Sequence, residues 1–228
     1  MKRPALLAAF ALLAALTLWA PAAAMVSADL NCTNGYFPTD QGGLGLAKVI
    51  DGPRVYLLQC PDEAPDCRQK AYVVPGDIVL VGRESGDYMC VLMPNRFGGS
   101  AGWVRHDRLT LTPTPPAPPL SSWAGDWANG DDTLKATILA QALKVDGDAC
   151  WPSCHVSIRE RPGGPNVGEI HGSAAPKSND LVIIDGDGPE ACRADLKLVG
   201  PYLVVSDNNA CGGMNVSFSG IYQRKARR

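Results

Sequence analysis

The stretch VVPGDIVLVGRESGDYMCVLM, residues 73–93, decides the fold of the first half of the chain. Two of its segments, 78–81 and 88–92, are rich in β-branched and other apolar side chains, as short strands are. Pro75-Gly76-Asp77 precedes the first segment and Ser85-Gly86-Asp87 separates the two, and such clusters mark turns. The stretch therefore predicts antiparallel strands joined by short turns.

Three further segments of the same character lie around it: 54–58, 71–74 and 102–104. Asp51-Gly52-Pro53 adds a turn before the first of them. Five short strands in a domain of this size are typical of a small β-barrel. We therefore expect an all-β N-terminal domain over residues 25–112.

The order of these segments resembles that of bacterial SH3-like (SH3b) domains. The resemblance rests on residues 73–93 followed by AGWVRHDRLTL, residues 101–111, and covers about residues 46–111. It implies an SH3-like barrel that holds a peptide or a peptidoglycan stem. An insertion containing Cys60 and Cys67 stands where the opening motif of that family would lie.

Five of the seven residues from Pro113 to Pro119 are proline. Proline cannot donate a backbone hydrogen bond to a sheet, and a run of prolines adopts an extended polyproline conformation. We interpret residues 113–121 as a stiff linker between two domains. The alternative is a proline-rich ligand for an aromatic groove of a partner protein.

The second predicted domain, residues 122–224, is a disulfide-stabilised antiparallel meander or barrel. Its clearest strand signals are 181–184, 195–198 and 202–205, together with 214–218, where Met214, Val216 and Phe218 alternate with polar residues. The segment TLKATILAQALKV, residues 133–145, fits a helix or a β-hairpin. We favour the hairpin because its apolar residues also alternate.

The ending DNNACGGMNVSFSGIYQR, residues 207–224, resembles the C-terminal domain of poorly characterised exported proteobacterial proteins. Those proteins carry a Trp-x-Gly-x-Trp motif early and a Cys-Gly-Gly motif late in the domain. The resemblance spans most of residues 123–224. The matching residues are Trp123, Gly125, Trp127, Cys192, Leu196, Leu198, Leu203, Val205, Asp207, Asn208, Cys211, Gly212, Gly213, Asn215, Val216, Phe218, Gly220 and Tyr222.

Some proteins related to that domain are grouped with lysozyme inhibitors, which are small secreted β-barrels. Those inhibitors place a Ser-Gly motif on an internal loop. Here Ser219-Gly220 falls in the predicted closing strand. We therefore assign no inhibitory role to Ser219.

The N-terminal segment has the layout of an export signal. Lys2 and Arg3 precede an apolar stretch from Ala5 to Trp19, and small residues ending at Ala24 offer a cleavage site. We expect residues 1–24 to be a cleaved signal peptide and the mature protein to be periplasmic or secreted. An uncleaved anchor is the alternative, but the apolar core is short for a hydrocarbon layer of about 30 Å, and no transmembrane segment is expected elsewhere.

The chain has 21 basic and 23 acidic residues, a formal net charge of −2, which falls to −4 once Lys2 and Arg3 are removed. Phosphate neutralisation requires clustered basic residues, so this balance argues against nucleic acid as a partner. The one basic cluster in the sequence runs from Arg224 to Arg228. We interpret residues 225–228 as a solvated basic tail, with attraction to a membrane surface or cell wall as the alternative.

All eight cysteines lie in the predicted exported part, four on each side of the linker. An even number in an oxidising compartment predicts four disulfides, two in each domain. Four cysteines permit three connectivities within a domain. The preferred pairs are Cys32–Cys90 and Cys60–Cys67 in the first domain, and Cys150–Cys154 and Cys192–Cys211 in the second.

The residues available for catalysis are few. The three histidines, His106, His155 and His171, lie in different local contexts, and the sequence has no nucleophile elbow, zinc-protease helix, phosphate loop or dinucleotide fingerprint. A copper site at Cys154-His155 and a calcium loop at residues 185–188 are less consistent with the sequence than a disulfide and a turn. We expect no enzyme activity, no metal and no cofactor.

Aromatic side chains are the better indication of a binding surface, since such residues anchor ligands in grooves. The candidates for ligand contact are Tyr88, Phe97, Trp103 and Trp151. For Trp103, as for Trp123 and Trp127, packing inside a small barrel is the alternative.

Together these observations predict a monomeric, exported binding protein of the cell envelope. Its SH3-like domain would recognise peptide or peptidoglycan, and its second domain would bind another protein. An inhibitor of a lysozyme-type hydrolase is the second hypothesis. An envelope hydrolase with an SH3-like targeting domain is the third, although it lacks a visible catalytic constellation.

Overall fold

The computed structural model describes residues 32–33, 37, 39, 43–95, 99–113, 117–157 and 159–225. These residues form two antiparallel β-sheets, so the predicted all-β class is confirmed. The predicted signal peptide, residues 1–24, and the last three residues of the basic tail lie outside them. Among the described residues, no helix combines the length and hydrophobicity needed to cross a bilayer.

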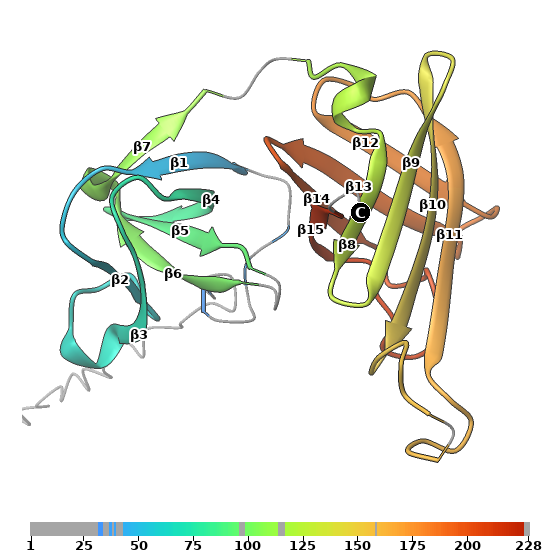
Figure 1. The fold of residues 1–228 in the computed structure, drawn as a ribbon, viewed down its shortest axis with the longest axis horizontal. Coiled ribbons are helices and arrows are strands. Elements are labelled where there is room, and N and C mark those ends of the chain that lie inside the picture. The colour runs from blue at the N-terminus through green and yellow to red at the C-terminus, as the bar shows by residue number, and fades with distance from the viewer. Residues whose placement is uncertain are drawn as a thin grey trace, which may run out of the picture.

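The N-terminal sheet has seven strands in the order β3-β2-β6-β5-β4-β1-β7 (Figure 1). Two 3-10 helices accompany it. The elements are β1 (Gly45–Val49), β2 (Val55–Leu58), η2 (Pro65–Cys67), β3 (Arg68–Val73), β4 (Ile78–Ser85), β5 (Tyr88–Met93), β6 (Ser100–Arg105), η3 (His106–Arg108) and β7 (Leu109–Thr112).

The stretch quoted first forms the centre of this sheet. β4 and β5 pair across a turn at Gly86, whose φ of 57° suits a glycine. Every residue of β4 from Val79 to Gly82 is buried, and so is every residue of β5 from Met89 to Leu92. One face of these strands packs inside the domain, and the other face packs against the second domain.

The C-terminal sheet has eight strands in the order β11-β10-β9-β8-β15-β14-β13-β12 and forms a nearly closed barrel. A 3-10 helix, η4 (Leu120–Ser122), precedes it. The strands are β8 (Gly125–Asn129), β9 (Asp132–Leu139), β10 (Ala142–Trp151), β11 (Asn166–Ala174), β12 (Asp180–Asp185), β13 (Cys192–Val199), β14 (Tyr202–Asp207) and β15 (Gly220–Arg224).

The seam of the barrel lies between β11 and β12. A Cβ at Gly172 of β11 would be 2.7 Å from Ile183 Cγ2 of β12, so glycine lets the strands approach. The backbone N–H of His171 donates to Asp185 at 2.7 Å across the same seam. The interior is filled by side chains that form one buried cluster, as eight-stranded barrels permit.

Residues 133–145 form the β9–β10 hairpin, which confirms the hairpin over the helix. The strand expected at residues 214–218 is wrong, because this segment is irregular and only Gly220–Arg224 pairs as β15. Val216 and Phe218 are buried, as the alternation indicates, but they pack into the barrel core without strand partners. Asn215 has a φ of 65°, which breaks the extended conformation.

All four predicted disulfides are confirmed: Cys32–Cys90, Cys60–Cys67, Cys150–Cys154 and Cys192–Cys211. Each domain closes its own pair of bridges, and no cysteine remains free. The thiol chemistry that reduced cysteines would offer is therefore absent from the folded chain.

The two domains pack against each other, which the linker pattern alone does not determine. A single buried cluster draws residues from both; its members are Leu44, Leu80, Leu92 and Ala101 from the first domain and Val199 and Val204 from the second. At the β13–β14 turn, a Cβ on Gly200 would be 2.5 Å from Leu46 Cδ1. Gln223 also donates to the Asn95 carbonyl at 3.3 Å. The described parts of the domains thus share one core contact.

Candidate functional site

An open groove of ≈ 560 Å³ lies beside β2 in the N-terminal domain. Its walls come from the turn before β2, from β2, from the segment around η2, and from the ends of β6 and η3. β2 and β3 lie on the side of this domain that faces away from the barrel (Figure 1). Clefts of about 300–1,000 Å³ are the usual size of ligand sites.

Four arginines line this groove: Arg54, Arg68, Arg105 and Arg108. Arg54 lies in the turn before β2, and the others lie in β3, β6 and η3, so the folded chain gathers charges that are scattered in the sequence. The chain as a whole is acidic, with a formal net charge of −2. The groove is therefore a local positive region on an acidic protein, and it favours anionic ligands.

Two neighbouring tyrosine rings lie at the groove, and one arginine stacks on each of them. Tyr56 and Tyr72 are cross-strand partners on β2 and β3, and their ring centroids lie 5.8 Å apart in an edge-to-face arrangement. The Arg68 Cζ lies 3.5 Å from the Tyr56 centroid, and the Arg54 Cζ lies 4.6 Å from the Tyr72 centroid. Stacking restrains a guanidinium group while its N–H edge stays open to a ligand.

The four arginines differ in their ion pairs. Arg105 Nε lies 3.3 Å from Asp107 Oδ2, and Arg108 binds both Asp107 and Asp51. Arg54 and Arg68 form no ion pair within the described part of the chain. Two guanidinium groups therefore stand at the groove without a carboxylate partner.

The charge distribution shifts two pKa values. Side-chain hydrogen bonds from Arg54 and, next, from Arg68 lower the pKa of the Tyr56 hydroxyl, because they favour the phenolate. The Asp107 carboxylate raises the pKa of Arg105. The unneutralised positive charge of the groove is thus concentrated near Tyr56.

The aromatic residues predicted for ligand contact do not form this groove. Trp103 is 1% exposed and packs in a buried cluster with the Cys32–Cys90 disulfide, so it belongs to the core and not to a surface site. Tyr88 is partly buried against the same cluster. Phe97 lies outside the described residues.

Trp151, the fourth candidate, lies in the other domain at the end of β10 and is 40% exposed. The Arg161 Cζ stacks 4.8 Å from its ring. It is therefore available for contact with a partner, but on a different sheet from Tyr88 and Trp103.

The groove residues Arg54, Tyr56 and Arg68, and Tyr72 beside them, are not among the sites predicted from the sequence, although a signal for them exists. Arg54 and Tyr56 stand two positions apart, and so do Arg68, Lys70 and Tyr72. Strand residues two apart point to the same face. A basic and aromatic face on two neighbouring strands was therefore readable, once the strands were known to pair.

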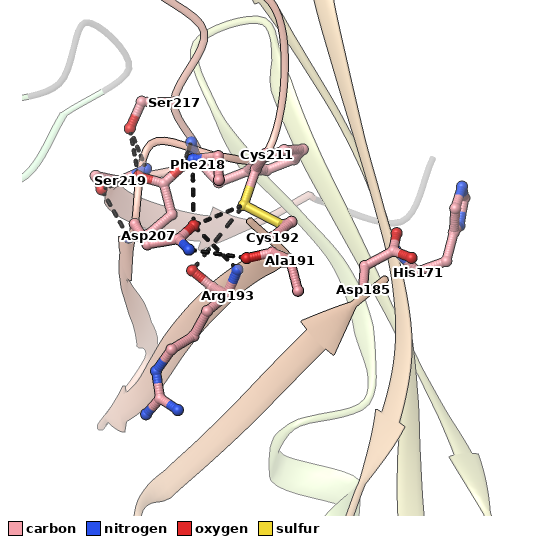
Figure 2. The surroundings of a disulfide bond; sticks show 12 residues. His171, Asp185, Ala191, Cys192, Arg193, Asp207, Cys211, Ser217, Phe218 and Ser219 are labelled. Carbon is pink, nitrogen blue, oxygen red and sulfur yellow. Dashed lines mark hydrogen bonds between the residues drawn. A yellow bond between two sulfur atoms is a disulfide. The ribbon is translucent and has the colours of Figure 1, made fainter. Parts of the chain in front are cut away.

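Asp207 has a structural role in the C-terminal segment, residues 207–224, which we call the C-terminal signature (Figure 2). Its carboxylate accepts from the Ser217 hydroxyl at 2.7 Å, the Phe218 N–H at 2.9 Å and the Ser219 hydroxyl at 2.7 Å. The Ser219 hydroxyl also accepts from the Asp207 N–H. Ser219 is thus occupied in holding the loop after β14.

The neighbouring signature residues close the same end of the barrel. Asn208 accepts from the Arg193 N–H at 3.1 Å and donates to the Ala191 carbonyl at 2.8 Å. The Cys192–Cys211 disulfide bonds β13 to the loop that follows β14. Gly212 lies so close to Gly168 of β11 that a Cβ would be 2.7 Å from the Gly168 Cα. These residues are explained by packing without a ligand.

The Trp-x-Gly-x-Trp motif is structural as well. Trp123 and Trp127 are buried, and the Trp127 indole donates to the Trp123 carbonyl at 2.9 Å. The Arg224 Cζ stacks 4.3 Å from the Trp127 ring, and its guanidinium donates to the carbonyls of Ala124 and Ser122. Arg224 therefore belongs to the barrel and not to the basic tail.

One cluster has the residue types of a hydrolase. Ser153, His155 and Asp131 lie together, but the Ser153 hydroxyl donates to Asp131 directly, and His155 Nε2 is 3.6 Å from Asp131. A catalytic triad needs the histidine to accept the serine proton. This hydrogen-bond arrangement does not activate Ser153 as a nucleophile, because Asp131 and not His155 accepts from its hydroxyl. The described residues also hold no group of three or more His, Cys, Asp or Glu placed for a metal ion.

No family model matches this chain, and no curated protein or solved structure matches it either.

Proposed function

We propose that this chain is an exported binding protein of the cell envelope, whose N-terminal SH3-like domain holds peptide or peptidoglycan in the arginine-lined groove. The class is a two-domain, disulfide-bonded, all-β binding protein. The observation that carries the proposal is the groove of ≈ 560 Å³ with Arg54, Arg68 and Tyr56 on its walls. Peptide and peptidoglycan stems carry carboxylates, which such a groove favours.

The proposed address rests on the cysteines. Four disulfides with no free cysteine are typical of proteins that fold in an oxidising compartment. The proposed signal peptide over residues 1–24 would deliver the chain there. The mature protein is then periplasmic or secreted, where cell-wall peptides are accessible.

Retention of the mature protein on purified peptidoglycan tests this function. We expect the wild-type protein to sediment with insoluble peptidoglycan, and the double variant Arg54→Ala/Arg68→Ala to remain in the supernatant. Arg159→Ala is the matched control, because Arg159 is an exposed arginine of the other domain. Wild-type protein that stays fully in the supernatant would refute peptidoglycan as the ligand. Equal retention of all three proteins would place the binding surface outside the groove.

The second candidate function, inhibition of a lysozyme-type hydrolase, draws on one observation. Trp151 at the end of β10 is exposed, and Arg161 from the segment before β11 stacks on it. Such aromatic anchors suit the cleft of an enzyme. Unchanged muramidase activity after adding the full mature chain at tens of micromolar would remove this candidate. Loss of activity that Trp151→Ala reverses would support it.

A further inference from the structure

Two guanidinium groups, those of Arg54 and Arg68, line the groove together with Tyr56. Arg68 stacks on the Tyr56 ring at 3.5 Å, and Arg54 stacks on the adjoining Tyr72 ring at 4.6 Å. Neither arginine has a carboxylate partner in the described part of the chain. Two positive charges in one groove favour an anion that can pair with both of them.

We infer that Arg54 and Arg68 form a carboxylate-binding site in which a free carboxylate of a short peptide lies at the Tyr56 hydroxyl. This inference rests on the proposed peptide-binding function and names the chemical group that the groove recognises. A guanidinium group offers two parallel N–H donors that match the two oxygens of a carboxylate. Both arginines are already restrained by stacking, so less side-chain entropy is lost on binding.

The rest of the groove indicates which residues would accompany that carboxylate. Val55, Leu58, Pro65 and Val104 supply apolar wall next to the arginines. Such a wall accepts small aliphatic side chains, for example the methyl group of alanine, and disfavours strongly hydrated groups. The expected ligand is therefore a short peptide in which a free carboxylate adjoins small apolar residues.

A polyanion such as nucleic acid fits less well. Three carboxylates, those of Asp51, Glu63 and Asp107, lie at or beside the groove within reach of its outer arginines. They neutralise Arg105 and Arg108 and would repel a run of phosphates. In the groove, only Arg54 and Arg68 have no carboxylate partner among the described residues, whereas binding along a phosphate backbone requires many positive charges.

Calorimetric titration of the full mature chain with a synthetic peptide tests the site. The probe is acetyl-Ala-Glu-Lys-Ala-Ala, compared with its C-terminal amide and with the peptide carrying glutamine for glutamate. We expect Arg54→Ala and Arg68→Ala each to weaken binding about tenfold or more. Arg68→Lys should recover only part of it, because lysine keeps the charge and loses the fork, and Arg159→Ala should bind as wild type does. Circular dichroism confirms that each variant is folded.

The results distinguish failure of the carboxylate site from failure of the proposed function. If the wild-type protein is retained on peptidoglycan but a peptide with both the C-terminal amide and the glutamine, which has no carboxylate, binds as tightly as the acid peptide, the carboxylate site is refuted and the proposed function stands. If peptidoglycan retains nothing while the acid peptide binds in an arginine-dependent way, the site stands, and the proposed function fails for peptidoglycan and holds for peptide alone. Equal binding of inorganic phosphate, or tighter and strongly salt-dependent binding of a single-stranded oligonucleotide, would overturn the carboxylate assignment.

Discussion

Replacing Asp207 with alanine should destabilise the C-terminal barrel while leaving the groove in the other domain unaltered. The carboxylate accepts three hydrogen bonds, from the Ser217 hydroxyl, the Phe218 N–H and the Ser219 hydroxyl. These bonds hold the irregular loop that carries Val216 and Phe218 into the barrel core. Without the carboxylate, the loop loses its attachment to the end of β14.

The loss in the free energy of unfolding depends on whether each donor to Asp207 can bond to water instead. Phe218 is fully buried, and a buried N–H without a partner costs about 1–3 kcal/mol. Ser217 and Ser219 are half-buried, so each hydroxyl can turn to water, and each bond contributes about 0.5–1.5 kcal/mol. Allowing for relaxation, the free energy of unfolding should fall by about 2–4 kcal/mol. For a chain of this length that corresponds to a fall in Tm of about 5–15 °C.

Urea unfolding followed by tryptophan fluorescence measures this loss, because Trp123 and Trp127 are buried in the same barrel. Asp207→Asn keeps one acceptor oxygen and should lose about half as much. Asp187→Ala is the control, since Asp187 is exposed in the turn after β12 and should change stability by less than about 0.5 kcal/mol. If Asp207→Ala unfolds at the same urea concentration as Asp187→Ala, the structural account of the signature is wrong. A fully stable Asp207→Ala protein that had lost a measurable hydrolytic activity would instead place Asp207 in a catalytic site.

Three further perturbations test other parts of the structure. Replacing both Cys192 and Cys211 with alanine should lower the unfolding free energy by about 3 kcal/mol in calorimetry, because the bridge closes a loop between residues 19 apart; an unchanged value would contradict its structural role. Val204→Asp buries a charge in the contact between the domains and should separate them. The variant should show two unfolding transitions and a larger radius of gyration in solution scattering. A single unfolding transition, unchanged from wild type, would refute the shared core. Hydrogen bonding to Asp146 raises the pKa of His171. The pair therefore stabilises the fold below the unfolded pKa of about 6.5, and this stabilisation is lost as the pH rises through the raised pKa. In urea unfolding, His171→Gln should remove a small excess of stability at pH 5.5 over pH 8.5, and the same pH dependence in both proteins would exclude the effect.

The strands that the sequence predicted well are those bounded by turn residues on both sides. β4 and β5 begin at Ile78 and Tyr88, as the segments 78–81 and 88–92 indicated, because a turn cluster precedes each strand. β4 continues beyond the predicted segment to Ser85, so only Gly86 and Asp87 form the turn. The proline tract also assigns four cysteines to each domain, which leaves three connectivities in each, and the preferred pairs are the ones that form.

The prediction failed where a distant side chain overrides the local pattern. Residues 214–218 alternate as a strand does, yet the Asp207 carboxylate draws their backbone and hydroxyl donors away from any ladder. The groove was missed for a related reason. Its arginines come from the turn before β2 and from β3, β6 and η3, and the pairing of β2 with β3 brings Arg54 and Arg68 to the same part of the sheet.

The packing between the domains changes what the linker can contribute to binding. For two modules joined only by a flexible or stiff tether, the gain from binding two targets depends on the reach of the linker. Here Leu80 and Leu92 of the first domain are buried against Val199 and Val204 of the second. The groove beside β2 and the Trp151 end of the barrel are then held at a fixed separation by that contact. Lengthening the proline tract should leave the affinity for a bivalent target unchanged, whereas Val204→Asp should make the affinity depend on linker length.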